Sequence, residues 1–191
     1  MTGDQRLARG ARSRRTITRH AVDVASAEGL SGLSFGRLAA DLSLSKGGVA
    51  TLFPSKEQLQ LATVETAGQV FQEAVVRPAM AAPAGAARLR ALVERWIEYA
   101  EAPLFAGGCF WAANLPDFDS RPGPVRDALA RQRRGWLGLL AEQLSQAAAG
   151  LDAELTAFQI DAVLNAANLA MRLGEAGAAD KVRRVVDELL T

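Results

Sequence analysis

The sequence predicts an all-α protein, with three short helices, one long helix and a larger helical body after them. Two observations support this fold class. Apolar residues recur at the spacing i, i+3, i+4 and i+7, and no segment alternates convincingly with the period of two that marks a half-buried strand. With 191 residues, 49% of them hydrophobic, the chain can form one domain or a small domain joined to a larger one.

Three helices are expected before residue 55. The first ends at Gly29, and the second and third cover residues 35–42 and 46–52, with the three residues "SLS" between them. Ser45 is the expected N-cap of the third helix. The apolar positions that predict these helices are Ile17, Ala21, Val24, Phe35, Leu38, Ala39, Leu42, Val49, Leu52 and Phe53.

The segment "PSKEQL" predicts the start of the long fourth helix. Ser55 is the expected N-cap, and Gln58, three residues later, is its partner in a capping box. The helix is expected to run to about Arg77, where Pro78 interrupts it.

Helical patterns return after the stretch "MAAPAGAA". An amphipathic helix ends at Pro103, and the segment "GGCFWAANLPDFDSRPGP" has room for one short helix. A further helix runs from Val125 to Gly150. The next, "ELTAFQIDAVLNAANLAMRLG", is apolar nearly all round, which predicts burial of most of its surface, and a last amphipathic helix follows.

Positive charge is concentrated at the N-terminus. The whole chain has a formal net charge of +1, but six arginines stand against Asp4 alone in the first twenty residues. Such an end suggests an anionic partner, either nucleic acid or a membrane surface, and a solvated disordered tail is the alternative. The arginines are Arg6, Arg9, Arg12, Arg14, Arg15 and Arg19.

The remaining composition restricts the class of protein. A single cysteine, Cys109, excludes an intrachain disulfide, and neither a signal peptide nor a membrane span is expected, so the predicted location is the cytoplasm. The one histidine, His20, has no cysteine near it, so no catalytic Cys/His pair and no metal site are expected. We therefore expect no enzyme activity and no cofactor.

The second and third helices have the spacing of a helix-turn-helix, in which the second helix of the motif enters the DNA major groove. Lys46, Gly47, Ala50 and Thr51 are expected to face outward. Two glycines at a helix start lower helix propensity by about 1 kcal/mol each, and close approach of the backbone to phosphates or bases would offset this loss. The alternative is a motif that serves packing alone.

Residues from about Thr16 to Ala67 resemble the DNA-binding domain of the tetracycline-repressor (TetR/AcrR) family of bacterial transcriptional regulators. The resemblance lies in "AVDVASAEGLSGLSFGRLAADLSLSKGGVATLFPSKEQL", with its "LA", "SKG" and "F-x-SKE-x-L" in the family's order. The later segments "GGCF" and "FDSRPGPVRDAL" are similar to a subgroup of the family's ligand domains. The resemblance implies a homodimeric repressor that binds a palindromic operator in double-stranded DNA and responds to a small apolar or aromatic effector. Such a protein would be associated with the nucleoid when bound to DNA.

The resemblance also implies the residues that contact DNA. Two positions depart from the family pattern, because Ala50 stands where a tyrosine is common and Ser43 where the turn often has a glycine. Basic residues of the first helix would compensate for the missing aromatic through phosphates or the adjacent minor groove. The expected DNA-binding residues are Arg14, Arg15, Arg19, Ser34, Ser45, Lys46, Gly47, Gly48, Thr51 and Lys56.

An effector site is expected in the C-terminal body, where aromatic residues cluster between residues 96 and 118. They line a cavity in one interpretation and form an ordinary aromatic core in the other. Asn165 and Asn168 lie one turn apart on the most apolar helix. Three roles are open for them: to bind the effector, to pair across a dimer interface, or to bond to local backbone. Cys109 is a redox sensor or a small buried hydrophobe. The candidate effector residues are Trp96, Tyr99, Phe105, Cys109, Phe110, Trp111, Asn114, Phe118, Asn165 and Asn168.

The dimer interface is expected to be a four-helix contact made by two helices of each subunit. Small residues on one helix would permit close approach, and an apolar face on the other would complement them. The candidate residues are Ala162, Ala166 and Ala170, with Val125, Leu129, Gln132, Trp136, Leu140 and Leu144.

The expected organisation is a disordered basic arm over residues 1–12, a helix-turn-helix domain over 13–60 and a ligand-binding and dimerisation domain over 61–191. The alternative function is that of a helical protein that binds a small molecule or a partner, with a helix-turn-helix that is only structural. Salt dependence separates the two, because DNA binding weakens steeply with salt.

Overall fold

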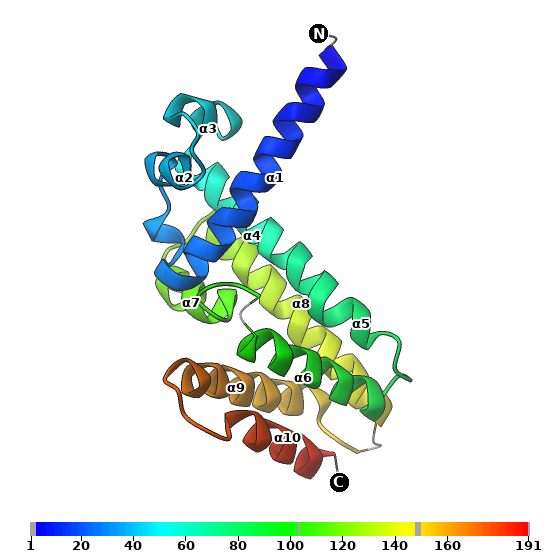
Figure 1. Ribbon diagram of the computed structural model, residues 1–191. Helices are drawn as coiled ribbons and strands as arrows, with labels where there is room; N and C mark the ends of the chain where they lie inside the picture. The colour runs from blue at the N-terminus through cyan, green and yellow to red at the C-terminus, as the bar shows by residue number, and fades with distance from the viewer. Residues whose placement is uncertain (1–2, 103, 148–149, 191) are drawn as a thin grey trace. The chain divides into compact units, whose positions relative to one another are not determined.

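The computed structural model describes residues 3–102, 104–147 and 150–190, and within these ranges the regular structure is entirely helical (Figure 1). This confirms the predicted all-α fold. The N-terminal helices are α1 (Gly3–Glu28), the short turn η1 (Leu30–Gly32), α2 (Phe35–Asp41), α3 (Lys46–Leu52) and α4 (Lys56–Phe71). A π-helical turn, η2 (Gln72–Val76), and α5 (Arg77–Ala79) continue α4, so the helical path runs through Pro78 instead of ending at it as expected, because a proline is tolerated in the first turn of a helix.

The C-terminal helices are α6 (Ala86–Glu101), α7 (Phe110–Phe118), α8 (Pro124–Ala147), α9 (Ala153–Arg172) and α10 (Ala178–Leu189). In the described ranges, no helix has the length and hydropathy that crossing a bilayer requires.

The chain divides into two compact units. The first, here called the head, comprises Met1–Gln69 and Phe105–Leu129, and the second, here called the body, comprises Val70–Leu104 and Ala130–Thr191. This division differs from the consecutive domains expected at residues 13–60 and 61–191, because α7 and its flanking segments pack with α1 in the head.

The head is organised around the C-terminal half of α1. Its core side chains are fully buried and come from every helix between α1 and α4, as the period of 3.6 residues predicts. They include Ile17, Ala21, Val22, Leu38, Val49, Phe53 and Leu59.

The first residues of the chain differ from the expectation. Residues 3–12, predicted to be disordered, form the beginning of α1, and Met1 and Thr2 lie outside the described residues. Forming a helix is unfavourable mainly at nucleation, and the buried half of α1 provides the nucleus from which the helix propagates toward its N-terminus.

The body contains α6, most of α8, α9 and α10. Helix α10 is strongly amphipathic, and Val182 and Val186 are buried on its inner side. Ion pairs join α6 to α10 at Arg90–Asp187 (2.9 Å) and Glu94–Arg183 (2.8 Å). Because these four side chains are about half exposed, the pairs contribute to orientation more than to stability.

Candidate nucleic-acid interface

Two capping serines define the helix-turn-helix. The Ser34 hydroxyl accepts a hydrogen bond from the Arg37 N–H at the start of α2 (3.2 Å), and the Ser45 hydroxyl accepts one from the Gly48 N–H at the start of α3 (3.0 Å). Val49 is fully buried and holds α3 against the head. Capping is a local interaction, so the predicted cap at Ser45 is confirmed.

The two glycines of α3 have different roles. A Cβ atom on Gly48 would lie 2.9 Å from the Ser45 Oγ, so this glycine leaves room for the cap. A Cβ atom on Gly47 would have no neighbour within 4 Å, so its backbone is open to solvent. Only Gly47 therefore offers the close backbone approach that the sequence suggested for both glycines.

The turn between α2 and α3 contains Ser43 in the left-handed region, with φ of 54°. This conformation costs a residue with a Cβ atom about 1 kcal/mol, and it explains why a glycine suits the position.

We expect Ser43→Gly to raise the free energy of unfolding by up to about 1 kcal/mol, since relief of the left-handed strain exceeds the entropy that glycine adds to the unfolded chain. Thermal unfolding measures the effect as a Tm increase of about 2–4 °C. Ser43→Ala is the matched control, because it keeps the strain; an equal gain from both variants would contradict this explanation.

The residues expected to read DNA lie at the surface of the head. Lys46, Gly47, Ala50 and Thr51 on α3 are all exposed, as are Ser34 and Ser45. The exposed Thr51 hydroxyl donates to the Gly47 carbonyl (2.8 Å). At the start of α4, the exposed Lys56 donates one of its three N–H groups to the Ser31 carbonyl (2.6 Å).

The arginines of α1 do not all remain available to DNA. Arg14 is half-buried, donates to the Leu52 carbonyl at the end of α3 (2.7 Å) and stacks on the Phe53 ring at 4.5 Å. Arg19 pairs with Asp23 (3.1 Å) and lies over the Phe105 ring at 5.2 Å. Both serve contacts within the head, and Arg15 alone of the predicted trio is exposed.

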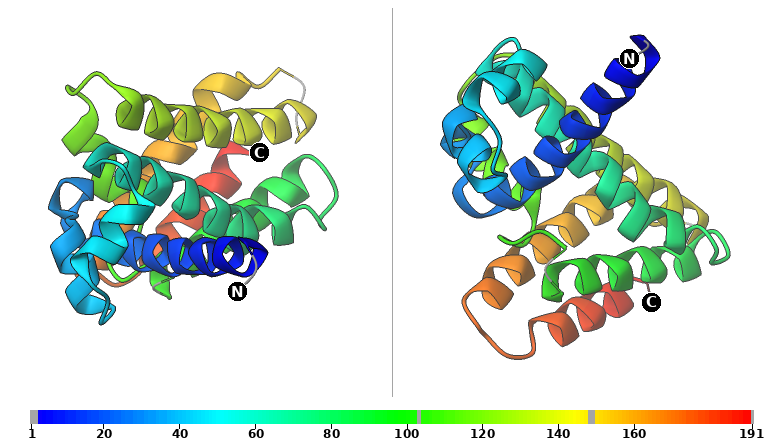
Figure 2. Two further views of the ribbon diagram at one scale, coloured as in Figure 1. Left: turned by 90° about the horizontal axis from the view of Figure 1, so that it is seen from above. Right: turned by 45° about the horizontal axis from the view of Figure 1, so that its top comes forward.

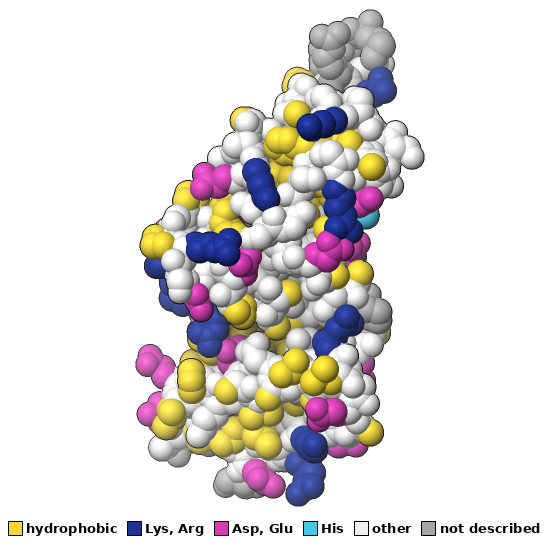
Figure 3. Space-filling view, turned by 90° about the vertical axis from the view of Figure 1, so that its left-hand side faces the viewer, with side chains coloured by type: hydrophobic (Ala, Val, Ile, Leu, Met, Phe, Trp, Pro, Cys, Tyr) yellow, Lys and Arg dark blue, Asp and Glu magenta, His cyan; other side chains and the backbone are white. Residues whose placement is uncertain are grey.

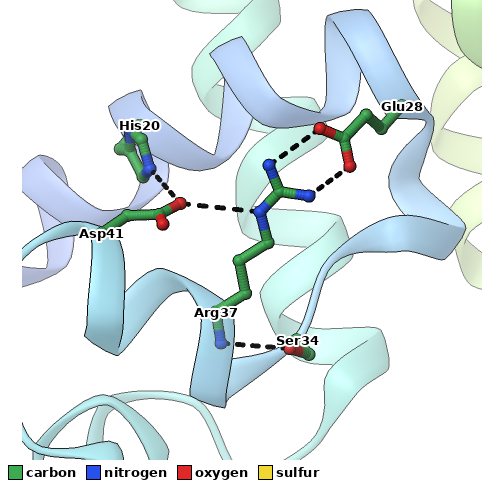
Figure 4. A network of polar contacts seen from close by, with 5 residues as sticks. All are labelled: His20, Glu28, Ser34, Arg37 and Asp41. Carbon is green, nitrogen blue, oxygen red and sulfur yellow. Dashed lines mark hydrogen bonds and ion pairs between the residues drawn. The ribbon is translucent and has the colours of Figure 1, made fainter.

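A polar network on the head holds α2 against α1 (Figure 4). Arg37 of α2 donates two hydrogen bonds to the Glu28 carboxylate, one of them at 2.7 Å, and its Nε lies 3.6 Å from the Asp41 carboxylate. His20 of α1 bonds to the same Asp41 at 2.9 Å. No local pattern in the sequence predicts a role for any of these four side chains.

The network lowers the pKa of two carboxyl groups. The hydrogen bond from Arg37 lowers the pKa of Glu28, and the hydrogen bond from His20 lowers the pKa of Asp41. Both shifts favour the ionised carboxylate in the folded protein. Their stabilising effect is therefore present above the unfolded-state pKa values of about 4, and it is lost as the pH falls through the folded-state values.

Asn114 of α7 is fully buried and bonds to the backbone of the head. Its side-chain oxygen accepts from the Leu30 N–H (2.6 Å), and its amide donates to the carbonyls of Ala25 (3.2 Å) and Phe110 (2.7 Å). This arrangement contradicts the expectation that Asn114 binds an effector, since its polar atoms already have partners in the chain. The sequence contains no signal that would have linked residue 114 to residue 30.

The segment before α7 approaches α1 at Gly107. Its N–H donates to the Ser26 hydroxyl (2.8 Å), and a Cβ atom on this residue would lie only 2.0 Å from the Ser26 carbonyl oxygen. Glycine is thus the residue that permits this contact.

The aromatic cluster expected to line one cavity belongs to two separate units. Phe105, Cys109, Phe110, Trp111 and Phe118 lie in the head, where Phe105 and Phe110 are fully buried and meet edge to face at 6.3 Å. Trp96 and Tyr99 lie in the body. For Phe105 and Phe110, full burial agrees with the alternative of an ordinary aromatic core. Cys109 is buried as well, with 6% of its surface exposed.

A second aromatic group in the body includes Phe71, which was not among the predicted effector residues. The Phe71 ring meets the rings of Tyr99 and Trp136 edge to face, at 5.3 and 5.4 Å, and Trp96 lies 6.4 Å from Tyr99. Phe71 ends α4, directly before the π-helical turn η2, and π-helical turns are frequent at functional sites.

The two asparagines of α9 differ. The Asn165 amide donates to the Asp161 carbonyl one turn earlier (2.8 Å), which matches the local-backbone alternative. Asn168 is buried, with 8% of its surface exposed. Asp161 itself is buried and pairs with Arg133 of α8 at 2.7 Å.

The α8 face predicted to meet a second subunit is mostly turned inward. Val125, Leu129, Leu140 and Leu144 are at most 5% exposed in the single chain, which leaves them no surface for a partner and contradicts that expectation. Gln132 and Trp136 are half-buried. On α9, Ala162 and Ala166 are exposed and Ala170 is half-buried.

Helix α9 was predicted to be buried on most of its surface, but one side of it is exposed. Four large apolar side chains form an exposed stripe with Ala162 and Ala166 between them. Their exposed fractions are 54% for Leu155, 56% for Phe158, 61% for Leu169 and 68% for Leu173. Figure 3 shows hydrophobic side chains gathered at the surface of the unit that contains α9 and α10.

Comparisons with known proteins place these features in context. Residues 85–186, more than half of the chain, match the family model for tetracycline-repressor-like C-terminal domains. No curated protein gave a significant match. A TetR-family transcriptional regulator from Streptomyces coelicolor has a similar structure, with a TM-score of 0.82 and 21% identity over 95% of this chain and 94% of that one.

Two further solved structures are similar. A TetR transcriptional regulator from Chloroflexus aurantiacus has a TM-score of 0.82 and 23% identity, over 96% of this chain and 94% of that one. AibR, whose structure contains isovaleryl coenzyme A and operator DNA, has a TM-score of 0.73 and 19% identity, over 93% of this chain and 95% of that one.

Proposed function

Because the chain belongs to the tetracycline-repressor-like family of transcriptional regulators, we propose that it is a repressor released from a palindromic operator by a small apolar or aromatic effector. One observation carries this proposal: helix α3 is capped, anchored from behind by Val49, and exposes Lys46, Gly47 and Thr51 together. A recognition helix presents its N-terminal residues to the major groove in this way.

Contacts with DNA would divide into reading and positioning. Thr51 offers a methyl group that suits the thymine methyl, and Lys46 is a donor for guanine or phosphate. Ser34 and Lys56, at the starts of α2 and α4, would bind phosphates, helped by the positive end of the α4 dipole. With few residues that read bases, specificity also depends on DNA shape.

We propose that the exposed stripe of α9 packs against a second copy of the chain. An apolar stripe of this length on a monomer favours association. Helix α8 supports the same assignment, because Gly135 and Gly138 are exposed in its interior and a Cβ atom on either would have no neighbour within 4 Å. Each glycine lowers helix propensity by about 1 kcal/mol, which close approach of a partner helix would offset. Two copies would place two α3 helices on one palindrome.

We place the effector site in the body, at the aromatic group of Phe71, Trp96, Tyr99 and Trp136, with Asn168 as a polar candidate. Apolar pockets with a few polar groups are the usual sites for such ligands. Phe71 ends α4, the helix that begins beside the DNA-binding motif, so an effector that binds one arrangement of this group better would shift the population of DNA-binding states.

The test is selection of binding sites from a random duplex pool, followed by anisotropy titrations of the selected duplex at several salt concentrations. A palindromic sequence and a steep loss of affinity with salt are expected. No enrichment, together with weak binding at low salt, would overturn the proposal and favour a helix-turn-helix that is only structural.

Two variants of the head separate positioning from reading. Lys56→Ala is expected to reduce the salt slope by about 1 for each subunit, because one phosphate contact is lost. Thr51→Ala is expected to relax the sequence preference at one base pair, by about 1–3 kcal/mol. Lys181→Ala removes one charge at an exposed position of α10 and is the control. If all three variants have the same salt slope and the same sequence preference, the assignment of α3 as the recognition helix is contradicted.

A further inference from the structure

Resting on the proposed function, we infer that residues 3–12, the helical start of α1, bind phosphates of the DNA that flanks the half-site read by α3. These residues are here called the arm. Figures 1 and 2 show that α1 continues beyond the rest of the head at its N-terminal end. The inference concerns residues that the proposed contacts of α3 and α4 do not include.

Most side chains of the arm are exposed to solvent. Gln5, Leu7, Arg9 and Arg12 are exposed, and Arg14, which follows the arm, joins α1 to α3 by its hydrogen bond to the Leu52 carbonyl. Leu7 is 75% exposed, although it lies on the same side of α1 as buried Thr18 and Ala25. The side of α1 that is buried in the head is therefore exposed to solvent along the arm.

Helix geometry determines how far the arm extends. Ten residues add about 15 Å to α1 beyond its contact with α3, which exceeds the major-groove width of about 12 Å. An arm of this length, if it lies along the duplex, spans the groove that holds α3 and is long enough to reach the DNA beside it.

The orientation of the arginines also favours flanking DNA. Arg9 and Arg12 lie roughly 140–160° around the helix from Arg14, the residue that faces α3. They point away from α3, and the exposed Arg15 continues their row one turn later. Phosphates beside α3 are therefore poorly placed for these side chains, and these side chains are assigned to phosphates of the flanking DNA.

The helical form of the arm gives a test that leaves charge unchanged. Gly10 lies in the middle of the arm, and a Cβ atom there would have no neighbour within 4 Å. Gly10→Ala is therefore expected to strengthen the arm helix, whereas Gly10→Pro breaks it by removing a backbone donor. Arg9→Ala/Arg12→Ala removes the charge directly.

The experiment uses the operator duplex obtained by selection, at two lengths. The short duplex contains only the enriched palindrome, and the long duplex has ten additional base pairs on each side of it. Affinity is measured by anisotropy over a range of salt for the full chain. The wild type is expected to bind the longer duplex more tightly, with a salt slope steeper by about 1.8 for each arm from Arg9 and Arg12 alone, because each of these two arginines contributes about 0.9. Arg9→Ala/Arg12→Ala is expected to lose this part of the slope together with most of the preference for the longer duplex, and Gly10→Pro is expected to weaken the same preference.

Gly10→Ala and the control Lys181→Ala/Arg184→Ala are expected to keep the preference of the wild type for the longer duplex. Equal wild-type binding to both lengths, or a preference that persists undiminished in Arg9→Ala/Arg12→Ala, would overturn the role of the arm while the proposed function stands. A wild type that binds no duplex would overturn both. Binding to phosphatidylglycerol vesicles that only the arm variants lose, with unchanged DNA binding, would assign the arm to membranes instead.

Discussion

Replacing Gly107 by alanine is expected to lower the free energy of unfolding by about 3 kcal/mol or more. The added Cβ atom would lie 2.0 Å from the carbonyl oxygen of Ser26 and 2.3 Å from the backbone nitrogen of Ala27. Both neighbours are backbone atoms of α1, so no side chain can rotate away. The segment must separate from α1, and the hydrogen bond from Gly107 to Ser26 is lost.

Thermal unfolding measures this effect as a Tm decrease of about 6–12 °C, at roughly 2–4 °C per kcal/mol for a chain of this size. Gly36→Ala is the matched control in the same unit, because its Cβ atom would meet nothing within 4 Å. That variant is expected to stabilise α2 by up to about 1 kcal/mol. A Gly107→Ala protein that melts within about 2 °C of the wild type would show that the segment does not approach α1 this closely.

The double variant Phe158→Asp/Leu169→Asp is expected to convert the proposed dimer to a monomer. Both side chains are more than half exposed on α9, so their replacement leaves the core of the single chain unchanged. In a two-fold contact each substitution occurs twice, and four carboxylates would meet in an apolar interface, where burial of unpaired charge is strongly unfavourable.

Sedimentation velocity measures the oligomeric state, and anisotropy with the operator duplex measures the consequence for DNA binding. A monomer loses the second half-site, which lowers the affinity by about 10²–10⁴-fold. Gln69→Asp/Gln72→Asp adds the same charge at exposed positions elsewhere and should remain dimeric. A dimer that survives Phe158→Asp/Leu169→Asp with wild-type DNA affinity would exclude the α9 stripe as the interface.

These two variants concern features that no local pattern predicted. The contact of Gly107 with Ser26 joins residues 81 positions apart, and the Asn114 contact with Leu30 joins residues 84 apart. Helical periodicity describes neighbours within one or two turns only. It therefore left Asn114 among the effector candidates, although its amide holds the backbone of the head.

The two faces of α8 and α9 illustrate the same limit. Apolar spacing predicted that Leu129, Leu140 and Leu144 share a side of α8, and they do share a buried one. Whether such a side meets the chain's own core or a second copy depends on the other helices that cover it. The exposed stripe of α9 became visible only after those helices were in place, because a nearly all-apolar helix does not reveal which side stays uncovered.

The sequence by itself determined the order of the helices and the starts of α3 and α4, since caps such as Ser45 and Ser55 and the apolar period act within a few residues. It also determined the helix-turn-helix spacing that carries the resemblance. The tertiary structure decided that the arm is helical, that Arg14 and Arg19 serve the head, and that α7 joins α1. These outcomes depend on packing between distant segments, whose burial and hydrogen bonding are defined only once the chain has folded.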